Sequence, residues 1–368
     1  MFRSACDTVS TPTKSLEDAL QARIITNMNE LTELLNLPQD HTARVRLASQ
    51  SFSLRFPDSL LPRVQRGQIS DPVLIQFLPD ERELVKTPGF SEDPLSEWKS
   101  VSSESDVASR YPYILQKYSG RALILTTHSC AARCRFCFRR YFPKDRALFP
   151  VPRDAVSLGL ARYLQEALKP IQADSTIHEL IFSGGDPLTL NNDELYGLLN
   201  YTKSLPHVKR VRFHSRVPVL TPARIDEDFP SFNDFNDSNE LAPLILHLAI
   251  HVNSPNEIDE SVMAAILRLR AKGYVLTSQT TLLRGVNDKL EVLLALYETL
   301  INLGVVPYYL FQLDRVQGAA HWETPTELGR TLIRELSARL PGYAVPKFAR
   351  EIPGFPMKAD LSVEKTLK

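Results

Sequence analysis

The amino-acid sequence predicts an α/β protein whose main domain is a partial, TIM-like (β/α)6 barrel. From about residue 121, six short apolar or β-branched segments follow one another along the chain. Longer segments with helical spacing separate most of them, and this alternation is typical of parallel sheets wound in right-handed βα units. Six units favour a partial barrel, although alternation alone also permits an open sheet. At 368 residues the chain is long enough for such a domain and flanking segments.

The strands and helices of this domain follow from β-branched runs and from helical periodicity, respectively. The predicted strands are Ala122–Thr127, Glu179–Ser183, Arg210–His214, Leu244–His251, Tyr274–Thr280 and Pro307–Leu313. The predicted helices are Asp154–Lys169, Asp193–Leu205, Glu260–Lys272, Lys289–Leu303 and Glu327–Leu340. Gly273 and Gly304 end two of these helices, because glycine adopts a left-handed conformation without strain. In a barrel, functional residues gather at the C-terminal ends of the strands.

The flanking segments differ from the barrel in composition. Residues 1–110 read as an N-terminal helical region, with an amphipathic helix at Ile24–Leu37 and a Ser-rich loop at Lys99–Arg110. The barrel occupies residues 111–326, and residues 327–368 form a C-terminal helix and tail. The segment Asp226–Asn239 shows no periodicity, so we expect an exposed insertion without a catalytic part.

The charge balance argues against two classes of function. Lys plus Arg and Asp plus Glu both total 43, so no whole-chain field attracts nucleic acid or an anionic membrane. No apolar run approaches the roughly 20 residues that span a bilayer, and the N-terminus lacks the apolar segment of a signal peptide. We therefore expect a cytoplasmic enzyme with a small-molecule substrate.

Three of the four cysteines lie directly after the first predicted strand. Cys130, Cys134 and Cys137 have the spacing C-x3-C-x2-C, and such a cluster in a reducing compartment indicates a metal site. Three thiolates can bind three irons of a [4Fe–4S] cluster and leave the fourth iron open. A structural zinc site with His128 as fourth ligand is the alternative. We interpret Cys6 as a bystander near the chain terminus.

This spacing, with an aromatic residue before the third cysteine, resembles the radical S-adenosylmethionine (SAM) superfamily, in which the open iron binds SAM. Two further segments resemble that superfamily's SAM-binding motifs, although each also fits an ordinary turn or ion pair. Gly184, Gly185 and Asp186 end the second strand, where the resemblance implies contact with the SAM ammonium. Ser215 and Arg216 end the third strand and suit the SAM carboxylate.

The segment Val345–Lys358 resembles the pyridoxal phosphate (PLP) lysine segment of the lysine 2,3-aminomutase family. The resemblance runs from about Ile24 to Lys358 and includes Leu282–Asp288 and Asp314–His321. It implies three cofactors: a [4Fe–4S] cluster, SAM and PLP. By position, it also implies that Lys358 forms the Schiff base of a PLP enzyme, that Arg121 contacts PLP, and that Gln279 lies near SAM.

The same resemblance implies how lysine would bind. Arg139 matches the arginine that receives the substrate carboxylate, and Asp314 and Glu351 match the two acids that hold the side-chain ammonium. One guanidinium and two carboxylates in a dry pocket would fix both ends of lysine.

The likeness is greatest to the subgroup whose β-lysine is used to modify elongation factor P. This subgroup shares Glu351, where the fermentative enzymes carry Asp, and it implies (R)-β-lysine as the product. Its partners would be an electron-donating reductase and a lysyl-tRNA-synthetase-like ligase that attaches β-lysine to elongation factor P. Two alternatives stay open: a radical SAM aminomutase for another amino acid such as glutamate, and a non-enzymatic iron–sulfur or zinc protein in which Lys358 is inert.

Overall fold

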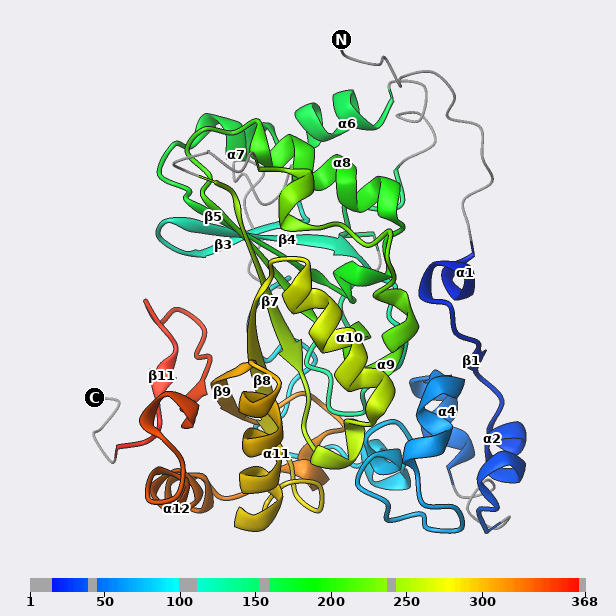
Figure 1. Ribbon diagram of the computed structural model, residues 1–368. Coiled ribbons are helices and arrows are strands. Elements are labelled where there is room, and N and C mark those ends of the chain that lie inside the picture. Colours follow the sequence, from blue (N-terminus) through cyan, green and yellow to red (C-terminus); the bar gives the residue numbers. More distant parts are fainter. Residues whose placement is uncertain are drawn as a thin grey trace.

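The computed structural model describes residues 15–38, 45–98, 111–143, 145–151, 159–236 and 243–363. Its centre is one nine-stranded sheet in the order β11-β10-β9-β8-β7-β6-β5-β4-β3 (Figure 1). The strands are β3 Ile114–Tyr118, β4 Arg121–Thr127, β5 Glu179–Gly184, β6 Arg210–Ser215, β7 Ile245–His251, β8 Val275–Leu282, β9 Val306–Gln312, β10 Lys347–Arg350 and β11 Ala359–Asp360. Strands β4 to β10 run parallel, and β3 and β11 pair antiparallel at the two edges.

The six predicted barrel strands correspond to β4 to β9, and the predicted α/β partial barrel is confirmed. The helices lie along the outer side of the curved sheet (Figure 1). They are α6 Leu160–Ala167, α7 Lys169–Ala173, α8 Asn192–Lys203, α9 Val217–Leu220, α10 Glu260–Ala271, α11 Leu290–Asn302 and α12 Thr326–Ser337. As expected, Gly273 and Gly304 follow α10 and α11 with positive φ angles of 82° and 76°.

Alternating burial along the strands separates the two faces of the sheet. In β8, Leu276, Ser278, Thr280 and Leu282 are buried, whereas the residues between them, such as Gln279, are partly exposed on the other face. Because side chains alternate across a strand, the partly exposed residues line the concave interior of the barrel. The apolar core therefore lies between the sheet and its helices, and the interior face is free for polar residues.

Two predicted helices differ from the structure. The part of Asp154–Lys169 that is described forms two helices, α6 and α7, with Leu168 between them. Pro170 follows this break, and proline cannot continue a helix across it, because it lacks an N–H and its ring clashes with the preceding turn. Residues 152–158, and the loop predicted at 99–110, lie outside the described residues.

The predicted helix Ile24–Leu37 was too long at its start. Ile24–Ile25 form β1, which pairs antiparallel with β2, Phe56–Pro57. Helix α2 spans Met28–Leu35, because the Asn27 side chain accepts hydrogen bonds from the backbone of Asn29 and Glu30 and caps the helix there. Short helices α1 Leu16–Leu20, α4 Arg46–Ser51, η1 Asp58–Arg63, η2 Leu74–Gln76 and η3 Glu81–Leu84 complete the described N-terminal region.

The expectation that Asp226–Asn239 is an exposed insertion is wrong for residues 226–236, and residues 237–239 lie outside the described residues. Phe229 and Phe235 are only 1% and 7% exposed, and Phe232 donates from its backbone to the carbonyl of Lys272. Phe229 packs against Tyr274, just before β8, and Phe235 packs against Tyr196 on α8, contacts that a polar composition conceals. None of the helices in the described ranges combines the length and apolar character that a bilayer crossing requires. The division of the chain at residues 110 and 326 stays a prediction.

Candidate active site

The three predicted cluster ligands lie on the loop that leaves β4. Cys130, Cys134 and Cys137 are free and partly buried, and the backbone N–H of Cys137 donates to the carbonyl of Cys134 over 3.1 Å. Phe136 fills the turn between the last two cysteines and packs edge-on against His251 and Trp322. The loop therefore has an apolar support, which favours a site that excludes water.

Two of the three thiols, those of Cys130 and Cys137, lie in surroundings that disfavour their charged form. Burial, followed by the neighbouring Cys134, raises the pKa of Cys137 to about 11, and burial raises the pKa of Cys130 as well. Thiolates are the metal-binding form, so iron binding must displace these protons. The described residues contain no group of three His, Cys, Asp or Glu side chains suited to hold a metal ion. The cluster ligands therefore stay a prediction, supported by the donor type and spacing.

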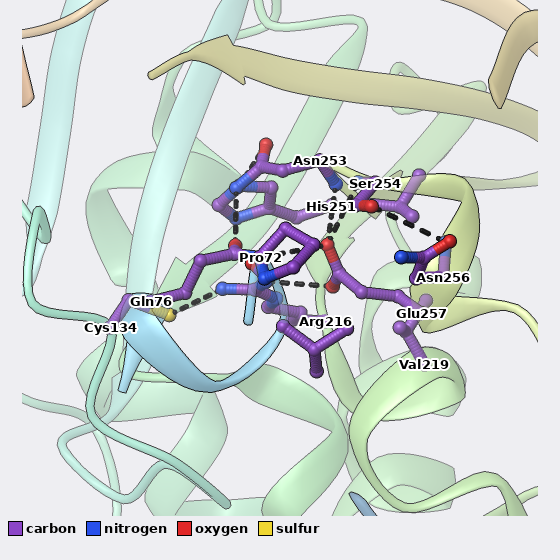
Figure 2. Close-up of polar contacts among 12 residues, drawn as sticks. Pro72, Gln76, Cys134, Arg216, Val219, His251, Asn253, Ser254, Asn256 and Glu257 are labelled. Atoms are coloured by element: carbon purple, nitrogen blue, oxygen red, sulfur yellow. Dashed lines mark hydrogen bonds and ion pairs between the residues drawn. The ribbon is translucent and has the colours of Figure 1, made fainter. Parts of the chain in front are cut away.

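Arg216 joins the cysteine loop to a buried polar network, drawn in Figure 2. Its Nη1 donates to Cys134 Sγ over 2.9 Å, and its Nη2 donates to Gln76 Oε1 over 2.6 Å and to Glu257 Oε2 over 2.7 Å. The other oxygen of Glu257 accepts from the backbone of Asn253 and Ser254. Arg216 is 4% exposed, so the alternative of a surface ion pair is wrong. Its predicted contact with the SAM carboxylate stays untested.

The two glycines after β5 lie directly against the start of the cysteine loop. A Cβ on Gly185 would lie 2.3 Å from the carbonyl oxygen of Ser129, and one on Gly184 would lie 2.5 Å from that of Thr127. No residue with a side chain fits there without moving backbone. This close approach holds the Gly184–Gly185 backbone against the start of the cysteine loop, and contact of these glycines with SAM stays a prediction.

Asp186 and Ser215 connect the C-terminal ends of β5 and β6. Asp186 accepts from Ser215 Oγ over 2.6 Å and from the backbone N–H of Arg216 over 2.7 Å. Because Asp186 is buried, its pKa is raised despite these bonds. The predicted SAM-binding residues of β5 and β6 thus form one connected unit, although a direct role of Asp186 toward SAM stays a prediction.

Lys358 and Arg121, the two predicted PLP residues, meet across a shared aromatic ring. Lys358 Nζ lies 5.2 Å and Arg121 Cζ 4.9 Å from the ring centroid of Tyr118 on β3. The Nε of Arg121 is buried and, among the described residues, has no hydrogen-bond partner. A cationic donor left unpaired beside a lysine and stacked aromatic rings fits an anionic aromatic cofactor.

The predicted substrate-binding residues are connected by a chain of charges. Arg139 donates from Nε and Nη2 to Glu97 over 2.7 and 3.0 Å, and Lys117 bridges Glu97 and Glu351 at 3.1 and 2.7 Å. Lys358 Nζ completes the chain with a 2.9 Å contact to the second oxygen of Glu351. The chain unites residues from four segments that are far apart in the sequence.

Asp314 lies near this chain, and Arg350 and Lys117 offset part of the effect of burial on its carboxyl. Burial and then the negative charge of Glu351 raise the pKa of Asp314 to about 7. Within the described residues its carboxylate forms no hydrogen bond or ion pair. By contrast, although burial works against it, Lys358 and Lys117 lower the pKa of Glu351 to about 2. The pocket therefore contains one carboxylate that is already paired and one that is ready to receive a cation.

Gln279 lies on the concave face of β8 between His251 and Tyr309 of the neighbouring strands. Four residues that the sequence did not single out also belong to the site: Gln76, Glu97, Lys117 and Glu257. Nothing in the sequence distinguishes these four from the many other charged or polar residues, because their partners lie far away along the chain. A weak signal is present only for Lys117, which lies in a short polar stretch just before the first barrel strand.

This fold, with three cysteines after its first parallel strand, defines a radical SAM enzyme, and residues 124–296 match the Radical SAM superfamily. Superfamily membership implies a [4Fe–4S] cluster and SAM. The L-lysine 2,3-aminomutase of Escherichia coli (strain K12) is 40% identical over 360 residues, 97% of each chain. That of Haemophilus influenzae is 38% identical over 89% of this chain and 90% of its own. An L-lysine 2,3-aminomutase from Clostridium subterminale is 31% identical over 90% of this chain and 74% of its own.

The chain therefore belongs to the L-lysine 2,3-aminomutase family, and the prediction of a radical SAM isomerase is confirmed.

Proposed function

We propose that this protein converts L-α-lysine to β-lysine with a [4Fe–4S] cluster, SAM and PLP. The observation that carries the proposal is the single charge-linked group formed by Arg139, Glu351 and Lys358, with Arg121 beside it and Asp314 facing it. This group has cationic and anionic ends, as a zwitterionic substrate with a second ammonium requires. A substrate such as glutamate would need a cation where Asp314 and Glu351 lie.

The cofactors, when bound, supply a carbon radical from SAM and a π-system on PLP through which the amino group migrates. The residues of the chain bind and orient the reactants. Arg139 receives the substrate carboxylate, and Asp314 and Glu351 receive its side-chain ammonium. Fixing both ends in one register places the two carbons that exchange the amino group beside the cofactors.

Loss of PLP from one lysine variant tests the cofactor assignment. Wild-type protein loaded with PLP is expected to show the visible absorbance of a lysine-bound cofactor, and Lys358→Ala is expected to abolish it. Lys347→Ala, at an exposed position on β10, is the matched control and keeps the absorbance. Equal absorbance in both variants would contradict the role of Lys358 and leave the non-enzymatic alternative standing.

The finer points concern the product and its use. We infer that the product is (R)-β-lysine, that a cytoplasmic lysyl-tRNA-synthetase-like ligase attaches it to elongation factor P, and that a reductase supplies the electron. Glu351 supports the stereochemical part, since the fermentative enzymes carry the shorter Asp at this position. Chiral chromatography of the product tests the configuration. Mass spectrometry of elongation factor P from cells with and without this protein tests its use, and an unchanged mass would contradict it.

A further inference from the structure

Two residues outside the predicted site, Glu97 and Lys117, connect its two ends. Arg139, at the carboxylate-binding end, is linked to Glu97, and Glu351, at the ammonium-binding end, is linked to Lys117. Glu97 and Lys117 are themselves paired at 3.1 Å. Neither residue has a role in the substrate contacts proposed above. Their pairing therefore indicates a different role, which is to hold the substrate-binding residues in place.

Glu97 fixes the orientation of the Arg139 guanidinium. The Glu97 carboxylate accepts hydrogen bonds from Nε and Nη2 of Arg139. The third nitrogen of the guanidinium, Nη1, donates to Ser183 Oγ over 3.0 Å. A bidentate arginine–carboxylate pair has little rotational freedom. Nη1 also donates to the carbonyl of Gly184 over 3.4 Å, which leaves one N–H of Nη2 for an incoming carboxylate. Burial alone would raise the pKa of Glu97, but Arg139 and Lys117 outweigh it, so Glu97 stays anionic.

Lys117 helps to hold Glu351 in place. Lys117 Nζ contacts one oxygen of Glu351 at 2.7 Å and Lys358 Nζ contacts the other at 2.9 Å, so both oxygens of the carboxylate are paired. Lys117 projects from the edge strand β3, which pairs with β4 and is thereby tied to the barrel. Three consecutive ion pairs, Arg139–Glu97, Glu97–Lys117 and Lys117–Glu351, therefore connect the two ends of the pocket, and neither end is an independent side chain.

We propose that Glu97 and Lys117 are positioning residues that lock Arg139 and Glu351 at a fixed separation and so make the pocket selective for the length of lysine. This inference rests on the proposed function. Unpaired Asp314 supplies the remaining charge for the substrate ammonium, and a diamino acid one methylene shorter cannot reach both ends of a rigid pair.

Equilibrium dialysis with labelled lysine and labelled ornithine tests the inference. The protein carries its cluster and PLP but no SAM, so no turnover occurs. In Glu97→Gln and in Lys117→Met, lysine affinity is expected to fall on the order of tenfold, with a much smaller change for ornithine. The preference for lysine over ornithine then falls by a similar factor. Lys117→Arg, which keeps the bridging cation, is expected to retain most of the preference.

The controls separate positioning from general damage. Glu335→Gln removes an exposed carboxylate on α12 that pairs with Arg339, just after the helix, and is expected to leave both affinities unchanged. Iron content and PLP absorbance of each variant report whether the site is otherwise intact. Unchanged selectivity in both Glu97→Gln and Lys117→Met, or an equal loss for lysine and ornithine, would overturn the inference. Wild-type protein that binds neither ligand would contradict the proposed function itself.

Discussion

Arg216 donates from Nη1 directly to the Sγ of Cys134 over 2.9 Å, and its other terminal nitrogen is held by Gln76 and Glu257. The contact joins a predicted cluster ligand to a buried ion pair between β6 and the loop after β7. The same guanidinium therefore contacts both the cysteine loop and the buried carboxylate of Glu257, which connects the predicted cluster site to the packing of the barrel.

Truncation of Arg216 is expected to destabilise the fold. Arg216→Met leaves the carboxylate of Glu257, which is fully buried, without its cation, and such losses cost about 3–5 kcal/mol. Adding Glu257→Gln to this variant is expected to recover part of the loss, since the uncompensated charge is removed. Denaturant unfolding of the apo protein measures both effects. Additive losses in the double variant would show that the two side chains do not act as a pair.

Loss of one cluster thiol is expected to prevent iron binding. Cys134→Ser removes a soft ligand, so iron content and the charge-transfer absorbance of the reconstituted protein should fall to near background. Cys6→Ser is the control, because Cys6 lies outside the C-x3-C-x2-C motif and should leave both values at wild-type levels. A Cys134→Ser protein that still binds a full complement of iron would contradict the ligand assignment.

The closeness of Gly185 to the cysteine loop predicts a steric effect on the cluster. In Gly185→Ala the new methyl group would lie 2.3 Å from the Ser129 carbonyl oxygen, so the loop must move. We expect reduced iron incorporation and a lower melting temperature. Gly342→Ala, whose Cβ would meet nothing within 4 Å, is the matched control and should resemble wild type. Equal iron content in the two variants would argue against this contact as a constraint.

Asp314 predicts a pH dependence for substrate binding. Because burial and Glu351 raise its pKa to about 7, Asp314 is largely protonated below that pH and cannot pair with an ammonium. The kcat/KM for lysine should therefore rise with pH through about 7, and Asp314→Asn should remove this step along with most of the activity. A wild-type kcat/KM that stays constant between about pH 6 and 8, roughly one unit on each side of this pKa, would contradict the assignment.

The same group has the opposite effect on stability. A carboxyl with a raised folded-state pKa stabilises the fold below its unfolded pKa, and this contribution is lost as the pH rises through about 7. Asp314→Asn should accordingly gain stability over wild type most clearly above that pH. Urea unfolding at several pH values measures the difference, and a gain confined to acidic pH would have the wrong sign.

The barrel could be predicted from the sequence because its strands are buried and parallel. Such strands are continuous apolar or β-branched runs, as in Ala122–Thr127, and the intervening helices have clear periodicity. Strands β3, β10 and β11 escaped prediction because they lie at or beside the sheet edges and mix charged with apolar residues. Lys347–Arg350, for example, begins and ends with a cation, and its pairing with β9 and β11 makes it a strand.

The site could be predicted only where a local motif marks it. The cysteines, Gly184–Asp186 and the Lys358 segment have distinctive neighbours in the sequence, whereas Glu97 and Lys117 are single charged residues of the kind that normally face solvent. Lys117 meets Glu351 across 234 residues of sequence. Such a pairing becomes visible only when the edge strand β3 and the C-terminal segment lie beside the same barrel.

Anaerobic conversion of lysine tests the central claim most directly. Protein reconstituted with iron, sulfide and PLP is given L-lysine, SAM and a strong reductant, and the amino acids are separated by mass spectrometry after derivatisation. The account predicts β-lysine that depends on SAM, on the reductant and on Lys358. Fully loaded protein that consumes the reductant yet leaves lysine unchanged, or that forms β-lysine equally well as Lys358→Ala, would contradict it.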